Sequence, residues 1–149
     1  MRKGENEESL EFQRLVEEPQ NSYSSYRSFK DLECWKACRD VRKWFSNLIK
    51  ELPKEEQFDL ISQMKRASRS TTANIAGGYG RFHYQENIQF CRTSRGSLYE
   101  LIDHLSVAVE EQYIMQEVSD EGEELIRKGI AIVNGYIKYL QKQKVKQVG

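Results

Sequence analysis

The stretch STTANIAGGYGRFHYQE (residues 70–86) is the first place where residue types and spacing could do chemistry, because three glycines stand beside an arginine. A phosphate-binding P-loop needs a preceding strand and a following Lys-Ser or Lys-Thr, and neither is present. A dinucleotide-binding fingerprint needs a third glycine after Gly78-Tyr79-Gly80 within a βαβ unit. We therefore interpret the cluster as a helix end, at which Gly77, Gly78 or Gly80 takes the left-handed conformation.

Other candidates for catalysis or metal binding are few. Glu100 and His104 are four residues apart and could share a metal ion on one helical face, but a di-iron bundle needs a second Glu-x-x-His pair, which is absent. Cys34 and Cys38 are also four apart, and we favour a packing role over a redox role for them. The sequence contains no HExxH motif and no order of Ser, His and Asp that predicts hydrolysis. We expect no enzyme activity, no metal and no cofactor.

The composition predicts one helical domain. The chain has 149 residues, of which 38% are apolar, 31% are charged and only two are proline. It has no apolar run of about 18 residues and no apolar core of a signal peptide near its N-terminus, so we expect a cytoplasmic protein without a membrane span. The three cysteines are an odd number without CxxC spacing, which is typical of reduced thiols.

Four segments have apolar residues at steps of three and four, which is the pattern of one buried helical face. We expect Asp31 to cap the first helix, Pro53 to separate it from the second, whose face begins at Phe58, and Ser119-Asp120 to cap the fourth. Short connections imply antiparallel neighbours. The predicted fold is all-α, an up-down-up-down four-helix bundle over residues 29–143, with a flexible polar and acidic arm at 1–28 and a basic tail at 144–149.

Ordered motifs in three segments indicate a family. The segments FKDLECWKACRDVRKWF, QMKRASRSTTANIAGGYGR and ENIQFCRTSRGSLYELIDHL contain the Phe-x-x-Leu opening, the Gln-x-x-Arg-Ala segment, the Asn-Ile-Ala segment and the Gly-Ser-Leu-x-Glu-Leu segment. From about Phe29 to Ile114 the chain resembles the bacterial four-helix-bundle family named for proteins encoded in intervening sequences of 23S rRNA genes. Trp35 is one position off the commonest spacing, and Gly77 stands where the family usually has Glu.

This resemblance implies a non-enzymatic bundle that assembles as a ring-shaped homo-oligomer, typically a pentamer. Accessory proteins of diversity-generating retroelements are similar in fold, and they bind nucleic acid and a reverse transcriptase through a basic surface. The resemblance therefore implies two kinds of partner. One is nucleic acid, with RNA as the first candidate, and the other is a reverse transcriptase or a larger nucleoprotein.

The charge distribution allows two interpretations. Residues 65–95 contain one acid, whereas residues 96–126 contain nine acids and neither Lys nor Arg. The basic residues of the second and third helices are candidates to bind nucleic acid in one patch; they are Lys65, Arg66, Arg69, Arg81, Arg92 and Arg95. Arginine suits phosphate because its planar fork binds two oxygens, and Tyr79, Phe82 and Tyr84 nearby could stack on unpaired bases.

In the alternative interpretation the charges serve ring assembly or a protein partner, and the tyrosines serve packing. Arg66 and Glu100 would then form a buried or interfacial ion pair that sets helix register, with Asn74 and Ser97 as polar partners. The candidates for structural or subunit contacts are Asn74, Gly78, Gly80, Ser97 and Glu100.

Overall fold

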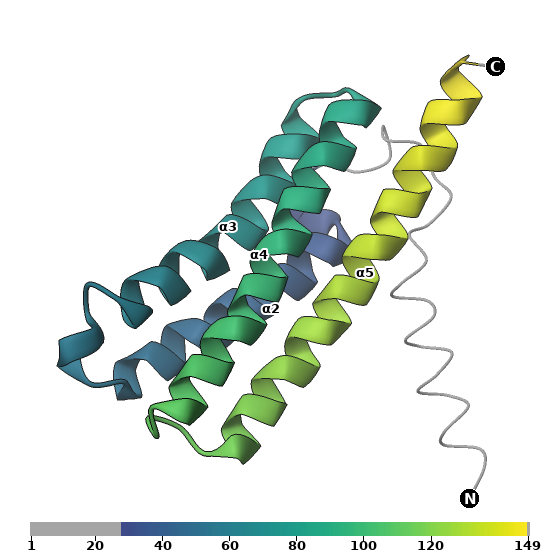
Figure 1. Ribbon diagram of the computed structural model, residues 1–149. Helices are drawn as coiled ribbons and strands as arrows, with labels where there is room; N and C mark the ends of the chain where they lie inside the picture. The colour runs from purple at the N-terminus through teal and green to yellow at the C-terminus, as the bar shows by residue number, and fades with distance from the viewer. Residues whose placement is uncertain (1–27, 149) are drawn as a thin grey trace, which may run out of the picture.

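The computed structural model describes residues 28–148. In this range the chain forms four long α-helices and no strand: α2 (Glu33–Leu48), α3 (Leu60–Gly80), α4 (Tyr84–Glu110) and α5 (Gln116–Val148). Short 3-10 turns lie before α2 at Phe29–Asp31, after it at Ile49–Glu51 and ahead of α3 at Lys54–Glu56. Successive helices run in opposite directions, and α5 packs on both α4 and α2 (Figure 1). The predicted all-α four-helix bundle is confirmed.

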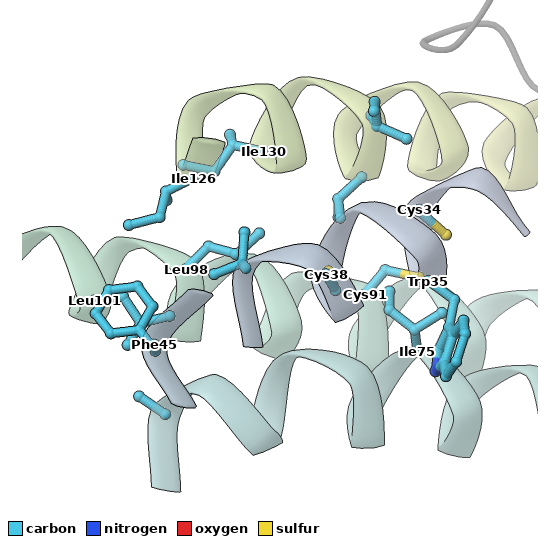
Figure 2. Close-up of a cluster of buried hydrophobic side chains, with 14 of the residues drawn as sticks. Cys34, Trp35, Cys38, Phe45, Ile75, Cys91, Leu98, Leu101, Ile126 and Ile130 are labelled. Atoms are coloured by element: carbon cyan, nitrogen blue, oxygen red, sulfur yellow. The ribbon is translucent and has the colours of Figure 1, made fainter. Parts of the chain in front are cut away.

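The core lies where the apolar periodicity places it. On α2 the buried positions include Cys38, Val41 and Phe45, and on α4 they include Leu98 and Leu101, each at helical steps of three or four. Figure 2 shows side chains from all four helices meeting in this space. Phe58, which we expected on the second face, is 85% exposed, because it lies in the turn before α3 rather than in the helix.

Two of the expected helix caps are wrong. Asp31 lies inside the 3-10 turn Phe29–Asp31, Ser28 caps that turn, and α2 starts after Leu32 without a side-chain cap. Helix α5 starts at Gln116, before the Ser119-Asp120 pair, and the Ser119 N–H already donates to the Met115 carbonyl. Ser119 is buried within the helix.

The glycine cluster does not end a helix by the left-handed conformation. Helix α3 continues through Gly77 and Gly78 to Gly80, and no glycine in the described range has a positive φ. Phe82 takes the left-handed conformation instead, with φ 53°. Close packing against α4 explains why a glycine stands at position 78. A Cβ there would lie 2.6 Å from Asn87 Oδ1 and 2.8 Å from Phe90 Cβ on α4.

The structure can be compared with the expected domain boundaries at both ends of the bundle. Helix α5 continues to Val148, so the boundary we expected after residue 143 lies inside a helix. Lys144 Nζ donates a hydrogen bond to Gln85 Oε1 near the start of α4, which ties this part of α5 to the bundle. Except for Ser28, the arm expected at residues 1–28 lies outside the described residues.

Candidate nucleic-acid interface

Arg66 and Glu100 form the expected ion pair between α3 and α4. Arg66 Nη2 lies 2.7 Å from Glu100 Oε2, and the side chains remain 62% and 45% exposed. An ion pair with this exposure contributes about 0–1 kcal/mol to stability, because water screens the charges. We expected a buried or interfacial pair; the pair links the two helices at the surface and is not buried.

Asn74 and Ser97 do not assist this ion pair. Both bond to Ser70: Asn74 Nδ2 donates to the Ser70 carbonyl and to Ser70 Oγ, each at 2.8 Å, and Ser97 Oγ donates to Ser70 Oγ at 2.9 Å. Ser70 thus joins α3 to α4 one helical turn away from Arg66. Sequence reasoning missed Ser70, although its spacing of four from both Arg66 and Asn74 places it on the same helical face.

Three of the predicted arginines lie apart from α2. Arg81 is exposed at the α3–α4 turn, with its Nε 3.9 Å from Glu86 Oε2 and its guanidinium over the Phe90 ring. Arg92 is exposed on α4. Arg95 Nη1 donates to Asn134 Oδ1 of α5 at 2.7 Å. None of these three arginines lines the hollows between α2 and α3 that Lys65 and Arg69 line.

Lys65 and Arg69 lie on the exposed side of α3 that borders α2. They line two hollows, of about 430 and 210 Å³. Ser46 of α2 and Ile49, which follows α2 directly, line both hollows as well. A third hollow, of about 360 Å³, continues toward Phe29, and Arg69 lines all three. A recessed strip therefore follows the line of contact between the two helices.

The charge of this strip has one sign. Of the described residues that line the three hollows, seven are basic and none is Asp or Glu. We name them the basic seam: Lys30, Arg42, Lys43, Lys50, Lys54, Lys65 and Arg69. Like charges gathered on a recessed surface raise the local potential and attract an anion. The seam thus has the charge and the shape that suit an anion.

Arg42 is the best-held cation of the basic seam. Its Nη1 donates to Thr72 Oγ1 at 2.9 Å across the α2–α3 contact, and its guanidinium carbon lies 5.9 Å from the centre of the Trp35 ring. A guanidinium fixed in this way loses little freedom when it binds a phosphate. Sequence reasoning missed Arg42, since only tertiary packing brings α2 beside Lys65 and Arg69. The cluster Arg39, Arg42 and Lys43 was the available signal.

Of the groups considered for catalysis or metal binding, His104 and the cysteines are buried, whereas Glu100 is exposed. His104 is buried, and burial lowers its pKa, while the nearby carboxylates of Asp103 and Glu100 oppose that shift. Burial raises the pKa of the Cys38 thiol to about 11, so it is a poor nucleophile near neutral pH. Within residues 28–148, no three His, Cys, Asp or Glu side chains are grouped to hold a metal ion. None of the helices in that range is both long and apolar enough to cross a membrane.

The fold and the surface together define a helical bundle with a basic recess between two of its helices. The family model described as 23S rRNA-intervening sequence protein matches residues 30–135. The chain therefore belongs to the 23S rRNA-intervening sequence protein family, as the motifs indicated. Comparison with curated proteins finds no match.

Proposed function

We propose that this chain is a non-enzymatic, homo-oligomeric bundle that binds nucleic acid, with RNA as the first candidate, through the surface between α2 and α3. It would act as an accessory to a larger nucleoprotein or reverse-transcriptase assembly. The observation that supports this proposal is the basic seam, in which seven cations line a recess without a described carboxylate. A ring of subunits would repeat the seam and convert weak contacts into avidity.

The seam supports a phosphate-binding role better than a purely structural one. Cations that stabilise a fold are usually paired, as Arg66 is with Glu100. Lys65 and Arg69 instead lie exposed beside other cations. Phosphates of a nucleic acid would neutralise this cluster and release the counterions bound to the nucleic acid. Binding should therefore weaken steeply as salt concentration rises.

The first experiment removes two seam charges. We expect the double variant K65Q/R69Q to bind a structured RNA more weakly than the parent chain at low salt. We also expect the slope of log K against log salt concentration to become shallower by roughly 1.4 to 1.8, since two phosphate contacts are lost. Fluorescence anisotropy over a salt series measures both quantities.

A matched control removes one arginine and one lysine outside the seam. Arg92 and Lys138 are exposed on α4 and α5, so R92Q/K138Q has the same net charge as K65Q/R69Q. We expect this control to bind like the parent chain, apart from a small general charge effect. An equal loss in both double variants would mean that no particular surface binds the RNA, and absence of binding at low salt would refute the proposed function.

A second candidate function is a protein-interaction scaffold in which the charges serve ring assembly. It is favoured by the exposed acidic residues Glu117, Asp120 and Glu121 at the start of α5, which are complementary to the basic seam of a second copy. Such a head-to-tail contact can close into a ring. Under this hypothesis K65Q/R69Q would dissociate the oligomer, and the parent chain would bind no nucleic acid. An intact oligomer in K65Q/R69Q would contradict it.

A further inference from the structure

The basic seam ends at a continuous set of aromatic rings. Phe29 and Trp35 line its last hollow, with ring centres 5.6 Å apart. The Phe29 ring is 6.5 Å from that of Tyr79, and the Tyr79 ring is 6.2 Å from that of Phe82. These aromatic residues, Phe29, Trp35, Tyr79 and Phe82, form what we name the aromatic end. It leads from the floor of the seam to the surface.

Phe82 is the exposed member of the aromatic end. Its side chain is 79% exposed, and its backbone has φ 53°, a conformation that non-glycine residues rarely adopt. A large apolar side chain in water and a left-handed backbone both cost stability, and Asn or Gly would be easier at this turn. Costs of this kind are concentrated at functional sites, where a ligand gains from the geometry.

The shape and charge of the seam favour a single strand over a duplex. Arg42 and Lys43 lie on α2, whereas Lys65 and Arg69 lie on α3, so cations stand on both sides of the recess. From Ile61 to Ala76 the recess follows about 22 Å of helix, since each residue adds about 1.5 Å. One sugar-phosphate backbone can lie between the two rows. A duplex would touch them only with its convex outer surface.

The aromatic end also favours a single strand over a duplex. The bases of a duplex are stacked on one another and offer no free face to a protein side chain. An unpaired base offers its whole face, and aromatic side chains bind it by stacking regardless of sequence. A basic groove that tracks the backbone, combined with an aromatic side chain on which a base can stack, is the arrangement found in proteins that bind single-stranded nucleic acid.

We propose that the basic seam binds an unpaired stretch of nucleic acid, and that one of its bases stacks on Phe82 at the aromatic end. The inference rests on the proposed function and names the substrate class within it. Arg42, held by Thr72 and Trp35, anchors a phosphate midway along the recess. Lys65 and Arg69 contact the neighbouring phosphates from α3.

The test compares two substitutions at Phe82 on a twelve-nucleotide oligo-uridine and on an RNA duplex of equal length. We expect F82L, which keeps the apolar bulk but loses the aromatic face, to weaken oligo-uridine binding by roughly 5- to 150-fold. F82W should bind at least as tightly as the parent chain. The salt dependence should be unchanged in both variants, because no phosphate contact is lost.

Tyr99 provides the matched control, because it is an exposed aromatic residue on α4 and does not line the seam. We expect Y99L to bind oligo-uridine like the parent chain, and circular dichroism should show equal helix content in all variants. Duplex binding as tight as oligo-uridine binding, with no effect of F82L, would overturn the single-strand inference and leave the proposed function standing. Failure of the parent chain to bind either probe would overturn both.

Discussion

At the scale of single residues, Cys38 shows how burial controls chemistry. Its Sγ lies 3.7 Å from Ser94 Oγ, and Ser94 Oγ donates to the Thr71 carbonyl at 2.8 Å. These polar contacts connect α2, α4 and α3 within the core. Burial raises the thiol pKa from its ordinary value of 9.0 to about 11, and the two hydroxyl groups only partly oppose this. The thiol is therefore a neutral packing group.

The raised pKa predicts a loss of stability at alkaline pH. Between about pH 9 and 11 the unfolded chain loses the Cys38 proton while the folded chain keeps it, so the free energy of unfolding falls as pH rises. The contribution is fully present below pH 9 and falls by up to about 1.4 kcal/mol per pH unit above it. Urea unfolding of the parent chain and of C38A from pH 8 to 11 measures the difference. Parallel curves would contradict the raised pKa.

At the scale of elements, the contact between α3 and α4 is the most extensive in the bundle. It depends on Gly78, because α4 approaches within the space that a side chain would need. Ser70, Ser97 and the Arg66–Glu100 ion pair join the same two helices farther along. The basic seam and the aromatic end both use α3, so its position against α4 also sets the candidate interface.

Two alanine substitutions separate close packing from helix propensity. In G78A the new Cβ would meet Phe90 Cβ at 2.8 Å, an atom next to the α4 backbone that cannot move freely. We expect this overpacking to cost about 1–3 kcal/mol of stability. Gly96 lies inside α4, and a Cβ added there would meet no neighbouring group within 4 Å, so G96A should stabilise by about 0.5–1 kcal/mol.

Urea unfolding midpoints measure both effects. The same chemical change should act in opposite directions at the two positions, which excludes a general effect of replacing glycine. If G78A were as stable as the parent chain, α4 would not approach α3 as closely as the structure shows.

At the scale of the whole molecule, the prediction concerns assembly. We expect a ring of about five copies, which light scattering would detect as a mass near five times 17.5 kDa. K65Q/R69Q should keep this mass while losing nucleic-acid binding, since the seam is proposed to face the ligand and not a neighbouring subunit. If the parent chain were a monomer, several seams could not bind one nucleic acid together, and avidity would be excluded from the proposed function. A monomer in the double variant alone would assign the seam to assembly.

Much of this architecture could be predicted from local patterns in the sequence. Apolar residues at steps of three and four, with only two prolines, are enough to specify four amphipathic helices, and burying their faces requires a bundle. The pairing of Arg66 with Glu100 was inferred because both belong to the family motifs and lie on adjacent helices, and the two side chains do form an ion pair. The family, too, was readable from ordered motifs, and the match over residues 30–135 agrees.

Tertiary structure decided what each helix faces. Residues 65, 66 and 69 are close in sequence, yet Arg66 turns toward α4 whereas Lys65 and Arg69 turn toward α2. Their partner Arg42 comes from a different helix, and no local pattern records that approach. Gly78 reads as a helix end in sequence, but its small size is used for helix contact. The sequence by itself determined the helices and their apolar faces; packing alone decided which charges share a surface.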